Sequence, residues 1–209
     1  MNPVKAIFFI LFGLFFCPFV AHAQVEFSVK ARATGFYGKY GDEFIGIGYE
    51  PSITLQPNDF WAGGVSFSEN LLGGYSDIHG KMSQFNFHVG AKRSLTPYFH
   101  PFIYTFAGFR FTEYKTSAYT WQEEPLLSSI ALNYGVKSGL QIGKGKWRFE
   151  GSLELMSGTK SRYLTEESIE KANSAGTDYR STAERSYITG LSAGIGITYV
   201  LDWDNVELE

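Results

Sequence analysis

Few residues in this chain combine the types and the spacing that catalysis requires. Acyl transfer by a serine needs a base and an orienting acid close by, and Ser76, Asp77 and His79 could supply them. They fall in residues 69–81, which we predict to be a loop, and a loop that holds these three residue types by chance is far commoner than a triad. We therefore predict no catalytic residue, no cofactor site and no metal site.

A larger set of polar residues is more informative because its members stand at alternate positions within apolar stretches. The members of this set that we expect to form a charge network are Arg32, Glu50, His88, Lys137, Arg148, Glu150 and Glu154, and Lys30 and Lys92 follow the same pattern. Alternate residues of a β-strand share one face. The role of these charges therefore depends on the strands that carry them.

The first 23 residues have the features of an export signal. Lys5 precedes an uncharged apolar run over residues 6–20, and Ala21-His22-Ala23 supplies a cleavage site before Gln24. Removal of this segment also removes Cys17, the only cysteine. We therefore expect no thiol or disulfide chemistry in the exported chain.

Composition limits the remaining function classes. The chain has 18 basic and 21 acidic residues and no block of like charge, which gives no footprint for nucleic-acid binding. No Pro-rich or Ser-rich linker divides residues 24–209, so we predict one domain with a short acidic C-terminal tail. A soluble β-sandwich could share this composition, so the pattern of residues must decide the fold.

Three long stretches alternate apolar with small or polar residues. In residues 45–55, for example, Ile45 and Ile47 alternate with Gly46 and Gly48, and residues 130–142 and 190–203 follow the same rule. These stretches are 11 to 14 residues long, whereas a soluble strand has about 5 or 6. A tilted strand needs roughly 9 to 11 residues to cross a bilayer, so the length favours a membrane barrel.

Five further strands complete the pattern, at residues 27–37, 60–68, 82–93, 101–112 and 146–156. The strand at 101–112 is apolar on both faces, so its inward side stays open. A β-bulge or a protein contact outside the barrel would explain this, and so would wrong limits for the strand. The sequence predicts an all-β fold, an eight-stranded antiparallel transmembrane barrel.

The connections between these strands differ in length. The short ones cover residues 56–59, 94–100 and 143–145, and the longer ones cover residues 69–81, 113–128 and 157–186. Exported barrels have short periplasmic turns and long external loops. Trp61, Trp147 and Trp203 would then form an aromatic girdle at the periplasmic rim.

In this alternation and loop pattern, residues 24–203 resemble the small outer-membrane barrels of the OmpA and OmpX type. The resemblance implies an integral protein of the outer membrane of a Gram-negative bacterium, in contact with membrane lipid. Members of that family commonly end on an aromatic residue, and here acidic residues follow Trp203. Some small barrels are lipid-modifying enzymes, but no histidine here has the serine two positions away that the deacylase barrels carry.

If the chain forms a barrel, the alternating charges face its interior. An eight-stranded barrel is only wide enough for its own interior side chains, so we expect the inward charges to pair and to be hydrogen-bonded. The alternative is that rearrangement of Arg32, Glu50, Lys137 and Glu150 opens a narrow pore.

The external loops are the expected place for recognition. Tyr119 and Trp121 in residues 113–128 could contact a sugar, lipopolysaccharide or a partner protein, or fold back over the barrel mouth. In residues 157–186, Thr165 predicts a helix start and Gly176 a helix end.

Together these patterns predict a non-catalytic barrel that serves as an envelope scaffold, or as a binding or assembly component, through its external loops or its wall. The alternative is a narrow passive channel gated by lumen ion pairs, and a lipid-modifying enzyme is less favoured. The expected partners are membrane lipid, an envelope protein or lipopolysaccharide, and no nucleic acid.

Overall fold

The computed structural model describes residues 24–37, 43–75, 77–116 and 125–202. The predicted signal at residues 1–23 lies outside this range, and so do Tyr119, Trp121, Trp203 and the acidic tail.

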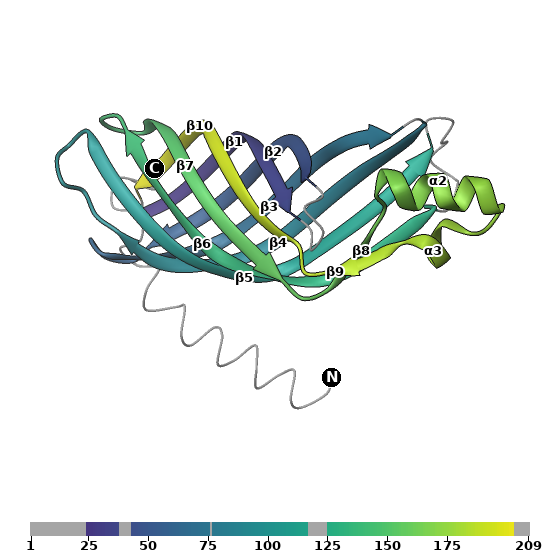
Figure 1. Cartoon of the computed structure of the whole chain (residues 1–209). Helices are drawn as coiled ribbons and strands as arrows, with labels where there is room; N and C mark the ends of the chain where they lie inside the picture. Colours follow the sequence, from purple (N-terminus) through teal and green to yellow (C-terminus); the bar gives the residue numbers. More distant parts are fainter. Residues whose placement is uncertain (1–23, 38–42, 76, 117–124, 203–209) are drawn as a thin grey trace, which may run out of the picture.

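Eight long strands form the body of the protein (Figure 1). They are β1 (Gln24–Tyr37), β2 (Glu43–Gln56), β3 (Trp61–Tyr75), β4 (Ile78–Lys92), β5 (Phe99–Thr116), β6 (Leu127–Ile142), β7 (Trp147–Gly158) and β10 (Thr189–Asp202). Between β7 and β10 the chain forms an insertion that contains β8 (Ser161–Tyr163), α2 (Glu166–Ala175), α3 (Tyr179–Thr182) and β9 (Glu184–Ser186).

The eight strands form a closed antiparallel barrel in the order β1-β10-β7-β6-β5-β4-β3-β2. Closure is made by β1, in which Gln24 pairs with Asp202 of β10 on one side and with Gln56 of β2 on the other. The first and last described residues therefore lie at the same end of the barrel. The eight-stranded antiparallel barrel predicted from the sequence is confirmed.

The two faces of this sheet are the reverse of those in a soluble protein. Outward residues such as Ile45, Phe149 and Ile195 are 71%, 73% and 74% exposed, whereas the inward Glu50 and Arg32 are 3% and 4% exposed. A soluble protein buries its aliphatic residues and exposes its charges. An apolar exterior around a polar interior is the arrangement of a barrel in lipid.

Several strands extend further than the sequence predicts. The predicted loop at residues 113–128 is partly strand, because β5 continues to Thr116 and β6 begins at Leu127. Residues 69–81 were predicted to be a long loop, which is wrong, because β3 continues to Tyr75 and β4 begins at Ile78. The inward Leu72 is buried, and the pairing shifts only between Leu72 and Tyr75. Buried and exposed residues alternate over residues 70–73 and again over residues 77–80. His79 therefore lies in β4, outside any loop triad, and Ser76 lies outside the described residues.

The ambiguous strand, β5, has its inward face defined by the neighbouring strand. Phe102 pairs with Gly139 of β6, and Phe106 pairs with Gly135. A Cβ atom at Gly139 would lie 2.4 Å from the Phe102 ring, and one at Gly135 would lie 2.6 Å from the Phe106 ring. These aromatic rings occupy the space that the two glycines leave open. Interior packing thus explains the second apolar face, without a bulge in β5 or an external partner.

The insertion contains the helix that the sequence predicted. In α2, the Thr165 side chain accepts from the backbone N–H of Ser168, and the Ser168 side chain accepts from the backbone N–H of Thr165, which forms a capping box. Gly176 ends the helix with φ of 61°, a conformation that glycine adopts without strain. Among the described residues, no helix is long and apolar enough to cross a membrane.

We predict that Gly139→Val lowers the free energy of unfolding by about 1 to 3 kcal/mol, because the new side chain would displace the Phe102 ring. Gly151→Val is the matched control, since a Cβ at outward-facing Gly151 meets nothing within 4 Å. Urea unfolding of the reconstituted barrel measures both variants. Equal stability of Gly139→Val and Gly151→Val would contradict the packing of β5 against these glycines.

Candidate functional site

The predicted lumen charges are all buried in the barrel interior. The acid with most cationic partners is Glu50, which lies 2.8 Å from Arg32, 3.0 Å from Lys30 and also contacts Lys137. These residues come from β1, β2 and β6, so the cluster spans the lumen from one wall to another.

Two further carboxylates extend this cluster towards β7. Glu150 lies 2.7 Å from Lys30 and accepts a hydrogen bond of 2.7 Å from the Thr198 hydroxyl. Glu154 lies 3.2 Å from Arg32 and 3.7 Å from Lys137. Each cation of the cluster is thus shared between two carboxylates.

A second group of charges lies nearer the end of the barrel where the chain begins. Glu26 contacts Lys92 and lies 3.4 Å from Arg148, and Gln141 donates to Glu26 over 3.1 Å. Glu26 was missed by the sequence analysis because the first strand was predicted to begin at residue 27. Its position in the sequence could have identified it, because Glu26 stands two residues before Ser28 and so continues the inward series of Ser28 and Lys30.

His88 is part of the lumen but not of an ion pair. Its Nε2 atom lies 3.0 Å from the Thr54 hydroxyl, and its ring lies 5.1 Å from the Tyr104 ring. The space between these side chains and Lys30 and Glu150 has a volume of about 10 Å³, near the minimum for one water molecule. The lumen at this level is therefore filled by side chains.

Nearer the insertion, Arg110 occupies the interior, and no carboxylate among the described residues lies within 4.0 Å of its guanidinium nitrogens. Arg110 is completely buried, and its Nη1 atom donates to the backbone oxygen of Ile188 over 3.2 Å. Its Nε and Nη2 atoms have no hydrogen-bond partner within the described part of the chain. Sequence reasoning missed Arg110 because the inward face of β5 was ambiguous.

A cluster of buried apolar residues lies towards the other end of the barrel. The barrel strands contribute Phe36, Leu72, Ile78, Met82, Phe106, Tyr114, Leu127 and Met156, and the insertion contributes Tyr163, Leu164, Ile169 and Ile188. The four insertion residues are each at most 3% exposed. We call this set the apolar plug. Its burial shows that the insertion folds onto the barrel interior rather than standing free in solvent.

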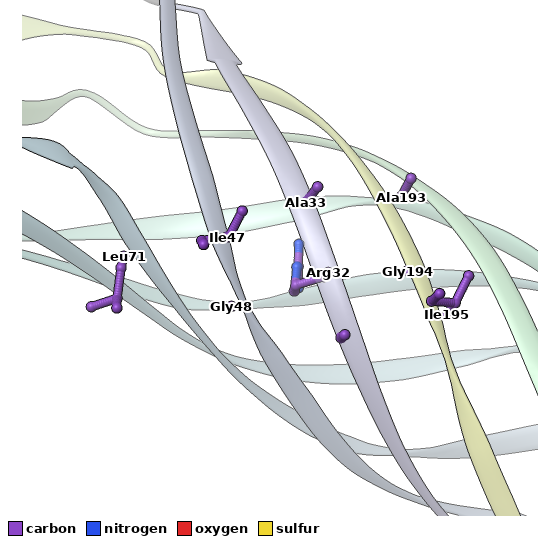
Figure 2. Close-up of a pocket in the computed structure, with 9 residues that line it drawn as sticks. Arg32, Ala33, Ile47, Gly48, Leu71, Ala193, Gly194 and Ile195 are labelled. Atoms are coloured by element: carbon purple, nitrogen blue, oxygen red, sulfur yellow. The ribbon is translucent and has the colours of Figure 1, made fainter.

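The outer wall carries a shallow apolar groove across β3, β2, β1 and β10 (Figure 2). Its volume is about 650 Å³. The small residues Ala33 and Ala193 pair across β1 and β10, with Ile47 and Leu71 on one side of them and Ile195 further along β10. Its apolar lining residues are exposed, whereas Arg32 is buried in the lumen. The groove is therefore a lipid-facing surface.

The structure describes two of the three tryptophans of the predicted aromatic girdle. Trp61 and Trp147 open β3 and β7 at the barrel end where the chain begins, and both are more than half exposed. The Trp147 ring lies 4.9 Å from the Tyr199 ring. Trp203 lies outside the described residues. No group of three or more His, Cys, Asp or Glu side chains in the described ranges could hold a metal ion.

Comparison with known proteins gives the fold but no sequence family. No protein-family model and no curated protein sequence matches the chain. The solved structure of Neisserial surface protein A, from Neisseria, matches with a TM-score of 0.63 at 9% identity, over 85% of this chain and 96% of that one. Ail, the attachment invasion locus protein of Yersinia pestis, in complex with the heparin analogue sucrose octasulfate, matches with a TM-score of 0.53 at 14% identity, over 86% and 99%.

The resemblance to small outer-membrane barrels is thus confirmed at the level of the fold. The closed barrel has this fold, and its outward face is apolar while its inward face is charged. This combination places the chain in the outer membrane of a Gram-negative bacterium.

We predict that Glu50→Gln destabilises the barrel by about 3 to 5 kcal/mol, because it leaves Arg32, Lys30 and Lys137 short of a buried counter-charge. The control is Glu69→Gln, which breaks the 2.6 Å pair with Lys81. That pair is partly solvated, so its loss should cost less than about 1 kcal/mol. Urea unfolding in detergent micelles compares the two variants, and equal effects would show that the lumen network adds no stability of its own.

Proposed function

We propose that this protein is a closed, non-catalytic outer-membrane barrel that acts as a scaffold. In this proposal the insertion between β7 and β10 is a folded platform that contacts another component of the cell envelope. The observation that carries the proposal is that the charge network and the apolar plug are both buried within the barrel, at two different levels. A barrel filled in this way presents its function on the outside.

The energetic cost of opening supports a scaffold over a channel. A continuous path would require separation of Glu50 from three cations and displacement of the apolar plug. Breaking one buried ion pair costs about 3 to 5 kcal/mol, and exposing each large plug side chain costs about 1.5 to 3 kcal/mol more. Both costs oppose the opening of a channel, and they add.

The orientation of the barrel supports an external platform. Gln24 and Asp202 lie at the same end, opposite the insertion. The predicted export signal would deliver the first strand from the periplasm, which places the short turns inside and the insertion outside. An insertion held by buried residues and by a capped helix gives a partner a fixed surface to recognise.

The wall offers a second contact surface for an envelope partner. The groove lined by Ala33 and Ala193 lets another chain approach the sheet closely. Tyr119 and Trp121 remain proposed recognition residues of the external loop, although they lie outside the described residues.

A narrow passive channel is the second candidate, and one observation favours it. Lys30 and Lys137 each contact two carboxylates, so each could exchange between partners at a small net cost. Such an exchange is the kind of two-state arrangement that a gate needs.

We predict that the wild-type protein gives no steady conductance in a planar lipid bilayer, because the network and the plug both fill the lumen. A channel would conduct, and Arg32→Gln or Glu150→Gln would change its conductance. Glu69→Gln serves as the control, since Glu69 lies on the outer wall. The channel proposal would replace the scaffold proposal if the wild type conducted steadily, if both lumen variants changed that conductance and if the control variant left it unchanged.

We also predict that extraction from native membranes in mild detergent recovers a stoichiometric companion, identified by mass spectrometry. Replacement of residues 160–187 by a short Gly-Ser turn should remove that companion, because the turn deletes the platform. Ala33→Trp fills the wall groove instead. Loss of the companion only with Ala33→Trp would assign the contact to the wall, and recovery of a lone barrel would contradict the scaffold.

A further inference from the structure

The two-stranded ribbon formed by β8 and β9 has one strongly basic face. Arg162 pairs directly with Arg185 across the ribbon, and both are exposed together with Lys160 and Tyr187. The Lys160 Nζ atom lies 5.4 Å from the centre of the Tyr187 ring, a cation–π contact. We call these four residues the basic ribbon face.

The cations of this face differ from other cations near the same end of the barrel. Lys81 pairs with Glu69 at 2.6 Å, and Lys115 pairs with Glu113 at 3.6 Å. By contrast, no carboxylate in the described part of the chain lies within 4.0 Å of a cationic nitrogen on the basic ribbon face. Like charges directly opposite each other destabilise a ribbon, so this arrangement favours an added anion.

The basic ribbon face continues the lipid-facing wall. Exposed and buried residues alternate without a break from Arg185 through Tyr187 to Leu191 of β10, so these three share the outward side. Leu191 is apolar and exposed, and Tyr187 lies four positions beyond it. That spacing is about 13 Å of strand, or roughly 10 Å of height at a tilt of about 40°. Tyr199, whose ring lies 4.9 Å from that of the exposed Trp147 at the opposite rim, stands twelve positions from Tyr187. That is roughly 30 Å of height at the same tilt, about the thickness of the hydrocarbon core, so the face lies at the level of the polar headgroups.

The ribbon is held firmly against the barrel. The Ser161 hydroxyl donates to the Ser129 hydroxyl over 3.1 Å, and the backbone N–H of Arg162 donates to the same oxygen over 3.0 Å. Ser186 and Ile188, on the opposite side from the basic ribbon face, are buried. Because the backbone that carries these cations is already held in place, anion binding costs little additional conformational entropy.

From this placement we propose that Lys160, Arg162 and Arg185 bind the phosphate group of a lipid in the outer leaflet. The two guanidinium groups supply the paired donors that match phosphate oxygens, and Lys160 adds a third cation. Tyr187 lies at the interface, where amphipathic aromatic residues are favoured, and the acyl chains of the lipid pack on Leu191 and Leu155 below. The site rests on the external orientation given in the proposed function.

A membrane lipid fits this surface better than a soluble polyanion does. A soluble polyanion would use the cations alone, whereas a lipid would also cover the exposed Leu155 and Leu191 on β7 and β10. Apolar contact and phosphate contact then act together on one ligand.

The test is titration of the purified full-length barrel, in micelles, with diphosphoryl lipid A and with dephosphorylated lipid A, followed by native mass spectrometry. The test variant combines Lys160→Gln, Arg162→Gln and Arg185→Gln. The control variant removes the same charge elsewhere, through Lys144→Gln, Lys171→Gln and Arg180→Gln, which are all exposed positions. Heat-modifiable mobility on a gel checks that both variants fold.

We expect the wild type and the control to prefer diphosphoryl lipid A, and the test variant to bind it roughly 100-fold more weakly. Equal binding of both lipids by the wild type, or full affinity in the folded test variant, would overturn the phosphate site. Binding of sucrose octasulfate as tightly as lipid A would overturn it in favour of a sulfated polysaccharide. Companion recovery and conductance do not enter this measurement, so its failure leaves the scaffold proposal standing.

Discussion

The structure depends on the closure of the sheet by the pairing of β1 with β10. Lipid offers no hydrogen-bond partner to a backbone N–H or C=O group, so a sheet in a membrane is stable only when it has no free edge. Closure divides every strand into an outward side that contacts lipid and an inward side that contacts other strands. The exposed Ile195 and the buried Arg32, from neighbouring strands, result from this one constraint.

Closure with eight strands also makes the interior narrow. Large inward side chains must therefore find partners across the lumen or space on a neighbouring strand. The carboxylate of Glu50 meets cations from two strands, while the rings of Phe102 and Phe106 cover glycines of β6. Charge pairing and aromatic packing thus solve the same problem of space in different parts of the barrel.

A filled interior moves the surfaces available for recognition to the outside. The insertion anchors itself through Tyr163, Leu164 and Ile169, which leaves its charged side chains facing solvent and the membrane surface. The wall groove and the basic ribbon face occupy different parts of the exterior. The proposed contacts with an envelope partner and with a lipid headgroup would therefore use separate surfaces.

The sequence by itself determined that eight strands form a barrel and where the helix between Thr165 and Gly176 lies, because alternation and capping are local properties of the chain. It did not determine the full length of the strands, since β3 and β4 extend into the predicted loop at residues 69–81. It did not determine the inward face of β5, which Gly135 and Gly139 on β6 decide through cross-strand pairing. Nor did it identify Arg110, or which carboxylate each cation meets. These features depend on register and on contacts between strands distant in sequence, which only the closed barrel brings together.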